Sequence, residues 1–246
     1  LVKLRKISPN IHRIRVTNER TAAALEEYGL GSKLIRIPLG VDLNKFAPDS
    51  EDKRARLRQE LGITPETHVI GSFQKDGVGW NLGEKPKMEK GPDIFVETMA
   101  ILSRRVPNML VLLAGPSRQY VKRELKGVGV RYLDCGLTTP ARLANLYRAL
   151  DVYIVASRLE GGPRALLESS ASGVPCVTTD VGQASTVFTG ELDFLISRSF
   201  DPHELANIVE KLIRLNDVNL LRQHLLRNAR KFSLGEVADL WEPLFV

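Results

Sequence analysis

Residues 151–179 read DVYIVASRLEGGPRALLESSASGVPCVTT, and this stretch decides the fold. Residues 152–156 form a short apolar run, which is typical of a strand inside a parallel sheet that is covered on both faces. Two glycines and a proline then interrupt the chain, residues 164–171 have helical character, and Gly173 ends this helix before a second strand at 175–179. Open α/β sheets bind their ligands at loops of this kind, which follow a strand and precede a helix. The stretch therefore predicts an α/β fold with a ligand site in this loop.

The loop combines the start of a helix with two carboxylates, Glu160 and Glu168. The unpaired N–H groups and the partial positive charge of a helix start favour phosphate. A carboxylate beside a phosphate is electrostatically unfavourable, so we expect Glu160 and Glu168 to accept hydrogen bonds from hydroxyl groups instead. Phosphate together with hydroxyls indicates a nucleotide, a sugar, or both. The alternative is that Glu160 is a solvated loop residue and Glu168 an exposed helix residue.

Strand-like and helical segments alternate along the rest of the chain, which predicts a doubly wound parallel sheet of the Rossmann-like kind. The expected strands are residues 14–17, 34–38, 68–73, 109–114, 130–133, 152–156, 175–179 and 194–196. The expected helices are residues 19–28, 52–61, 92–105, 119–125, 140–150, 164–171, 201–215, 218–231 and a terminal helix that begins at 233. The polar stretch 74–89 is long for a connection in an α/β unit, and long loops are often functional.

The net charge of +6 and the isoelectric point of about 9.4 suit an anionic partner such as a nucleotide or acidic lipid headgroups. We do not expect nucleic acid as a partner, because the basic residues lie on predicted helix surfaces without interleaved aromatic residues or a known motif. Contact of the basic stretch 211–231 with the inner face of a membrane stays open beside a plain solvated helix pair. Cys135 and Cys176 have no metal-ligand spacing and are expected to be reduced thiols in a cytoplasmic protein.

The spacing Glu160-x7-Glu168, with the sequence ASGVP at 171–175, resembles the donor-site signature of family-4-type glycosyltransferases (glycosyl transferases group 1), which have the GT-B fold. The sequences VTN at 16–18, YGL at 28–30, GVD at 40–42 and FAP at 46–48 resemble the connection between the two lobes of such an enzyme. The resemblance implies that the chain is mainly the C-terminal, donor-binding lobe. The implied units are residues 1–40, the last strand and helix of an otherwise absent N-terminal acceptor lobe with its linker; 41–232, the nucleotide-sugar-binding domain; and 233–246, a helix that returns toward the N-terminal lobe.

The resemblance also implies roles for particular residues. Lys90, which precedes Gly91, matches the family's lysine for the donor diphosphate, and Lys75 is expected to replace the basic residue that usually follows the first strand of the lobe. Glu160 would orient the transferred hexose and Glu168 would hold the ribose. The further expected donor contacts are the turn at Gly115, Arg131 at the nucleobase, and backbone groups of Gly161, Gly162, Arg164, Ala165 and Leu166. Alternatively the two lysines and Arg131 are solvated.

Two departures from the family pattern concern the pocket beside the sugar. Gly162 and Pro163 stand where Phe-Gly is commoner, and Ser185 stands where an acidic residue is common. The shape of the pocket near the transferred sugar is therefore not given by the resemblance.

The activity implied is transfer of a hexose from a nucleoside diphosphate sugar to a glycan, a lipid-linked or a small-molecule acceptor, with retention at the anomeric carbon. No cofactor and no metal are expected, since there is no Asp-x-Asp pair and cationic groups can neutralise the leaving diphosphate. With its acceptor lobe absent, the isolated chain is expected to bind donor but to transfer poorly. Alternatives are a non-catalytic nucleotide-sugar-binding subunit that needs a partner chain, and a sugar-nucleotide epimerase or phosphorylase with the same two-lobed plan. The sugar, the base, the acceptor and the oligomeric state are not given by the sequence.

Overall fold

The chain folds around a six-stranded, wholly parallel sheet with the strand order β5-β4-β3-β6-β7-β8. A computed structural model describes residues 8–79, 82–215 and 217–244. The strands are β3 His68–Ser72, β4 Met109–Leu113, β5 Tyr132–Asp134, β6 Val152–Val155, β7 Cys176–Thr179 and β8 Ile196–Ser197. The order reverses between β3 and β6, as it does in doubly wound sheets, so the predicted fold class is confirmed.

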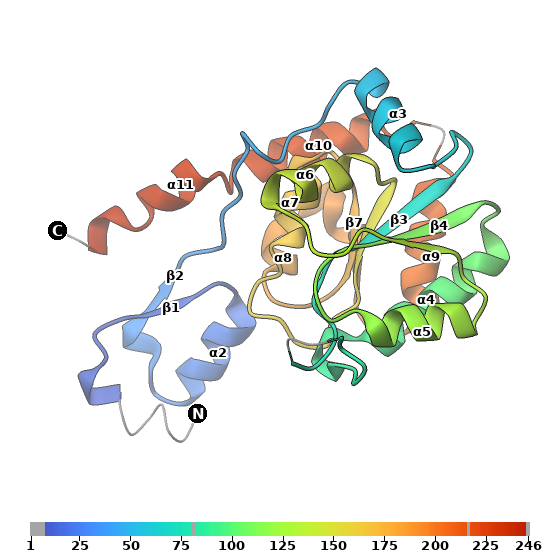
Figure 1. Cartoon of the computed structure of the whole chain (residues 1–246). Helices are drawn as coiled ribbons and strands as arrows, with labels where there is room; N and C mark the ends of the chain where they lie inside the picture. Colours follow the sequence, from blue (N-terminus) through green and yellow to red (C-terminus); the bar gives the residue numbers. More distant parts are fainter. Residues whose placement is uncertain (1–7, 80–81, 216, 245–246) are drawn as a thin grey trace.

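Helices cover both faces of this sheet (Figure 1). One face carries α4 Pro92–Arg105, α5 Gln119–Gly127 and α9 Pro202–Ile213, and the other carries α6 Pro140–Arg148, α7 Ala165–Ala171 and α10 Asn219–Arg230. The remaining helical segments are η1 Ser8–Asn10, α3 Glu51–Glu60, η3 Met88–Lys90, α8 Ala184–Val187, η4 Gly190–Leu195, α11 Leu234–Asp239 and η5 Glu242–Leu244. Burial on both faces explains why β4 and β6 are continuous apolar runs without alternation.

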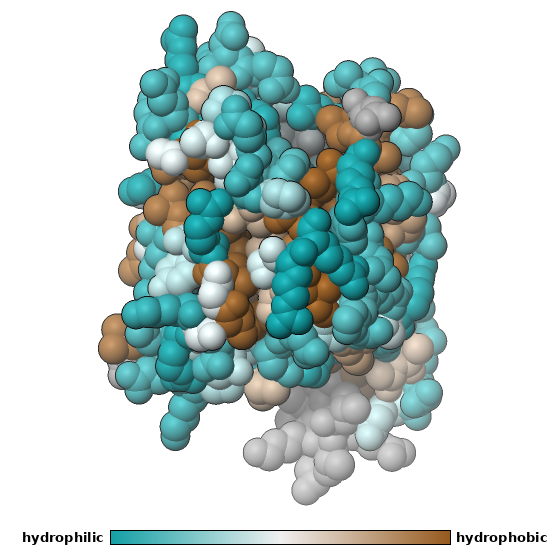
Figure 2. Space-filling model, turned by 90° about the vertical axis from the view of Figure 1, so that its right-hand side faces the viewer, coloured by the Kyte–Doolittle hydropathy of each residue, from teal (hydrophilic) through white to brown (hydrophobic). Residues whose placement is uncertain are grey.

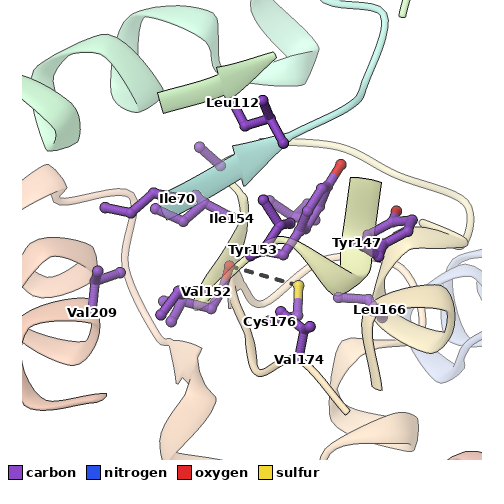
Figure 3. Close-up of a cluster of buried hydrophobic side chains, with 14 of the residues drawn as sticks. Ile70, Leu112, Tyr147, Val152, Tyr153, Ile154, Leu166, Val174, Cys176 and Val209 are labelled. Carbon is purple, nitrogen blue, oxygen red and sulfur yellow. Dashed lines mark hydrogen bonds between the residues drawn. The ribbon is translucent and has the colours of Figure 1, made fainter. Parts of the chain in front are cut away.

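Strand β6 lies in the middle of the sheet, and its four residues are all buried. Tyr153 packs against Tyr147 of α6 with ring centroids 5.1 Å apart, and its hydroxyl accepts a hydrogen bond from the Phe73 amide at 2.8 Å. Figure 3 shows Tyr153 and Cys176 side by side, with Leu166 and Tyr147 close to them. This cluster fixes β6 and α7, and hence the loop between them, on a rigid base.

A second, smaller unit precedes the sheet. Strands β1 Ile14–Val16 and β2 Leu34–Arg36 pair in parallel and carry α2 Glu19–Glu27, followed by η2 Gly31–Lys33. Its own core consists of Val16, Ala22, Leu25 and Leu30. Figure 1 shows this N-terminal unit beside the large sheet, with the C-terminal segment returning alongside the linker.

Three contacts tie that C-terminal segment to the earlier chain. The Val41 amide donates to the Phe232 carbonyl at 2.8 Å, and the Leu234 amide donates to the Val41 carbonyl at 3.0 Å. The Arg15 guanidinium of β1 lies 5.3 Å from the ring centre of Trp241, which is a cation–π distance.

Several predicted elements differ from the structure. The strand predicted at 194–196 is wrong at its start, because Gly190–Leu195 forms the 3₁₀ helix η4. In this helix Leu192 and Leu195 lie three residues apart and are both buried, which satisfies the period of a 3₁₀ helix. Strand β5 begins at Tyr132, two residues later than predicted, and a short helix α8 begins at Ala184 in a region predicted as loop.

Candidate functional site

Lys90 and Glu160 meet at the carboxyl edge of the sheet. Gly91 makes the approach possible: its φ of 59° is left-handed, and a Cβ there would lie 1.8 Å from the Ala156 carbonyl oxygen. The close contact brings Lys90 against the loop that follows β6, where its Nζ lies 2.5 Å from Glu160 Oε1. The same oxygen accepts a hydrogen bond from Ser157 Oγ at 2.8 Å. The structure thus brings together a cation and an acid that are 70 residues apart in sequence.

Neighbouring hydrogen bonds fix the backbone on both sides of this ion pair. The Glu89 carbonyl accepts from the Arg158 amide at 2.8 Å, and Gln74 Nε2 donates to the Lys90 carbonyl at 3.0 Å. Arg158 also binds both carboxylate oxygens of Asp93, at 2.7 and 2.6 Å. Such a bidentate pair constrains orientation as well as distance. The Lys90 segment and the Glu160 loop are therefore held as one unit.

Glu168 lies in the first turn of α7, behind the loop, and is half-buried. Its Oε2 accepts a hydrogen bond from the Tyr147 hydroxyl at 3.0 Å. Burial raises the pKa of Glu168 above its ordinary value, although the Tyr147 hydrogen bond and the charge of Arg164 act in the opposite direction. The alternative that Glu168 is an exposed helix residue is wrong. A half-buried acid with one fixed partner is typical of a binding site.

The loop between the two acids is shaped by close packing. A Cβ on Gly162 would lie 2.9 Å from Leu39 Cδ1, and one on Gly182, whose φ is 56°, would lie 2.7 Å from Pro163 Cδ. Of the amides predicted to bind the donor, that of Leu166 is engaged within the loop, since it donates to the Pro163 carbonyl at 3.3 Å. Arg164 is exposed, and Ala165 is the first residue of α7.

Gly115 and Lys75 lie at the same edge of the sheet. Gly115 follows β4 with a φ of 100°, and a Cβ there would lie 3.0 Å from the Phe73 carbonyl oxygen beyond β3. The glycine lets the ends of these two strands approach closely. Lys75 lies three residues beyond β3 and is half-buried.

Arg131 is not brought to this edge. It precedes β5, is exposed, and donates to the carbonyl of Met109, the first residue of β4, at 3.4 Å. In a parallel sheet a residue that precedes one strand and contacts the first residue of the next lies at the amino edge. The prediction that Arg131 binds the nucleobase therefore has no geometric support. The assignment of Arg131 rested on the family resemblance, because a strand expected at 130–133 places Arg131 in its amino half as well.

A buried ion pair at this edge was missed by sequence reasoning. Arg118 Nε lies 3.1 Å from Asp76 Oδ2, and both side chains are almost fully buried. The Arg118 guanidinium also donates to the carbonyls of Ser72 and Ala114, at 2.6 and 3.1 Å. Within the described residues neither oxygen of Asp76 has a hydrogen-bond partner, and burial raises the pKa of Asp76 to about 6, against the effect of Arg118. Nothing in the local sequence marks these two residues as partners.

The Asp76–Arg118 pair anchors the long polar stretch over the start of α5. An antiparallel bridge joins Gly77 to Pro86, and the carbonyls of Leu82 and Gly83 accept from the amides of Gln119 and Tyr120, both at 3.0 Å. The chain's own carbonyls thus occupy amide groups at the N-terminus of α5, where an anion would otherwise bind.

Over the described parts of the chain, no three His, Cys, Asp or Glu side chains group closely enough to hold a metal ion. Within those same parts, no helix has the length and apolar character needed to cross a membrane.

Comparison with known proteins identifies the family. Residues 85–232 match the family described as Glycosyl transferases group 1, and this match spans more than half of the chain. The chain belongs to this family.

Its relatives match between about three fifths and nearly all of the chain. The D-inositol 3-phosphate glycosyltransferase of Corynebacterium jeikeium is 27% identical over 93% of this chain, which covers 55% of that protein. The protein of the same name from Nocardia farcinica is 30% identical over 91% of this chain, which covers 49% of it. The lipopolysaccharide core biosynthesis mannosyltransferase LpsB of Rhizobium meliloti is 31% identical over 61% of this chain. The chain spans about half the length of these relatives.

Solved structures share the fold. HepE of Anabaena, solved in complex with UDP-glucose, superimposes with a TM-score of 0.75 at 19% identity over 95% of this chain and 64% of HepE. Sucrose-phosphate synthase of Thermosynechococcus elongatus gives a TM-score of 0.74 at 20% identity, over 94% of this chain and 57% of that one. At these identities the likeness shows the GT-B fold alone.

Proposed function

We propose that this chain is the donor-binding part of a glycosyltransferase that moves a hexose from a nucleoside diphosphate sugar to an acceptor. The observation that carries the proposal is the Lys90–Glu160 ion pair at the carboxyl edge of the sheet. The half-buried Glu168 follows Glu160 in the chain, in the first turn of α7. Family membership and relatives named as glycosyltransferases and a mannosyltransferase support it. A structural neighbour solved with UDP-glucose supports the class of donor.

Lys90 would act on the leaving group. When the bond between the anomeric carbon and the diphosphate oxygen breaks, negative charge develops on the diphosphate. A lysine already fixed at this edge stabilises that charge without reorganisation, and Lys75 is proposed to assist it. With positive charge supplied in this way, the proposed reaction needs no metal ion.

Glu160 is suited to hold the transferred sugar. Its Oε1 binds Lys90 and Ser157, and Oε2 has no hydrogen-bond partner within the described residues. An ionised carboxylate oxygen accepts hydrogen bonds from sugar hydroxyls, so one residue would join the lysine and the sugar. Glu168, oriented by Tyr147, would accept hydroxyl groups of the ribose in the same manner.

The acceptor site is proposed to lie on a second lobe. Residues 8–37 already supply two strands and a helix beside the loop between Glu160 and Glu168, which we call the donor loop. The relatives are about twice as long as the region matched. A longer form of this chain or a partner chain would provide the rest. Transfer with retention of the anomeric configuration is part of the proposal and rests on the family resemblance.

Isothermal titration calorimetry with a panel of UDP-, GDP- and ADP-sugars tests the proposal. At least one donor should bind the wild-type chain. Lys90→Met should weaken that binding about tenfold to a hundredfold, the effect of losing one hydrogen bond to a charged group. Lys53→Met is the matched control, because Lys53 is an exposed residue of α3 whose partner is Asp49, and its affinity should not change. Absence of binding across the panel, or equal affinity of Lys90→Met and wild type, would overturn the proposal.

A further inference from the structure

Two side chains of the N-terminal unit bind one carbonyl group of the loop between Glu160 and Glu168. Gly161, between the two acids, is exposed, yet its carbonyl oxygen accepts two hydrogen bonds from residues more than 140 positions earlier. Asn18 Nδ2 donates at 2.7 Å, and Thr17 Oγ1 donates to the same oxygen. Asn18 Nδ2 also lies 3.2 Å from Thr17 Oγ1, so the three groups form one connected set.

The orientation of Asn18 is fixed from its other end. Its Oδ1 caps α2 by accepting from the Thr21 amide at 2.8 Å, and the side chain is only 6% exposed. Rotating the amide by half a turn would break the cap and the bond to Gly161 together. The cap therefore directs the Nδ2 donor at the loop.

The linker contacts the loop at the next residue. Gly162 packs against Leu39, whose amide donates to Gln183 Oε1 at 2.9 Å. Gly182, in its left-handed conformation, packs against Gly162 and Pro163. The peptide between Gly161 and Gly162 thus has contacts from the N-terminal unit, from the linker and from Gly182.

Fixing one carbonyl orients the amide next to it. The peptide is trans, so the Gly162 N–H points opposite to the Gly161 C=O, away from Thr17 and Asn18. Two donors on the carbonyl also polarise the peptide and make that N–H a stronger donor. An anionic ligand gains from an amide that is both oriented and polarised.

We infer that Thr17 and Asn18 are positioning residues, which orient the Gly161–Gly162 peptide so that its N–H binds the nucleoside diphosphate sugar. The inference rests on the proposed function and makes the N-terminal unit part of donor binding. It assigns these two side chains a role in the affinity for donor, beyond the attachment of one unit to the other.

Asn18→Asp separates this role from the helix cap. Aspartate caps a helix as well as asparagine does, but it cannot donate to the Gly161 carbonyl. We expect its donor affinity to fall about fivefold to tenfold. Thr17→Val should show a similar loss, whereas Thr17→Ser, which keeps the hydroxyl, should bind as wild type. Asn207→Asp is the matched control, since Asn207 is exposed on α9 beside Arg105, and it should also bind as wild type.

A measurement without ligand distinguishes the inference from the proposed function. The amide ¹⁵N shift of Gly162 reports hydrogen bonding to the preceding carbonyl, and it should move in Asn18→Asp and stay in place in Asn207→Asp. An unmoved Gly162 signal overturns the inference even if no donor binds the wild type, which would by itself overturn the proposed function. The inference is also overturned if the Gly162 signal moves but Asn18→Asp and Thr17→Val bind donor as tightly as wild type does. The contact would then only attach the N-terminal unit to the loop.

Discussion

An acid that is paired with a basic side chain lies near each end of strand β6. The two acids differ in how many of their carboxylate oxygens are left without a hydrogen-bond partner. Asp151 directly precedes the strand, at the amino edge of the sheet, and Glu160 follows it at the carboxyl edge. From the sequence alone both are acids beside an apolar run. Their surroundings separate a structural role from a binding role.

At the amino edge both carboxylate oxygens of Asp151 are used. Asp151 Oδ1 binds Arg54 at 2.6 Å and Arg58 at 3.3 Å, and Oδ2 accepts the Val69 amide at 2.7 Å. A groove of about 330 Å³ lies here, lined in part by Arg54 and Asp151. Figure 2 views the molecule from the side opposite β1 and β2, and it shows apolar surface between hydrophilic side chains. The groove is lined by Asp151, but both oxygens of this carboxylate are already engaged.

At the carboxyl edge the acids are only partly used. Glu160 engages Lys90 and Ser157 with one oxygen, and Glu168 has a single bond to Tyr147. The loop between these acids is held by the N-terminal unit through Gly161. The comparison teaches that the binding site is better recognised from acids that keep an unused hydrogen-bond acceptor on a well-fixed loop. Charge and groove volume alone do not distinguish it from the amino edge.

The largest expected effect concerns the amino edge. Asp151→Ala leaves the half-buried Arg54 and the buried Arg58 without their shared acid, so it should lower the free energy of unfolding by about 2–3 kcal/mol. Chemical denaturation measures this, with Glu60→Ala, an exposed residue of the same helix as the two arginines, as control. Donor affinity should be unaffected. A loss of affinity without a loss of stability would reverse the roles given to the two ends.

A smaller effect concerns Glu168 and pH. Burial raises its pKa, so it takes up a proton at a higher pH than an ordinary glutamate, and a protonated carboxyl accepts fewer hydroxyl hydrogen bonds. Donor affinity should therefore fall as the pH is lowered from 8 toward 5. Glu168→Gln should bind about tenfold more weakly than wild type at pH 8 and should lack the part of the pH dependence that Glu168 contributes. Calorimetry measures donor affinity across this pH range. If the affinity of Glu168→Gln and that of wild type depend on pH in the same way, Glu168 is not the group responsible for the dependence.

Much of the architecture follows from local sequence. The apolar runs of β4 and β6 predict buried parallel strands, and Gly91 followed by Pro92 predicts the start of α4 just after Lys90. Since parallel strands share their carboxyl edge, the proximity of Lys90 to the loop after β6 could be predicted as well. Glu160 and Glu168 were found through their spacing around that loop.

The rest depends on tertiary contacts that carry no local signal. The Asp76–Arg118 pair joins two loops, and only the folded chain shows that both side chains are buried. Arg131 was assigned from the family resemblance, and only its contact with the Met109 carbonyl shows that it lies at the amino edge. Asn18 could be predicted as a helix cap, but its second bond to Gly161 could not, since the partner lies in the other unit.

Hydrogen exchange measured by mass spectrometry tests most directly which end of β6 binds ligand. With a saturating nucleoside diphosphate sugar, peptides that cover residues 88–92 and 157–168 should become protected, and peptides that cover residues 51–62 should exchange as in the free protein. Protection of 51–62 without protection of 157–168 would contradict the account, because it would place the ligand at the amino edge.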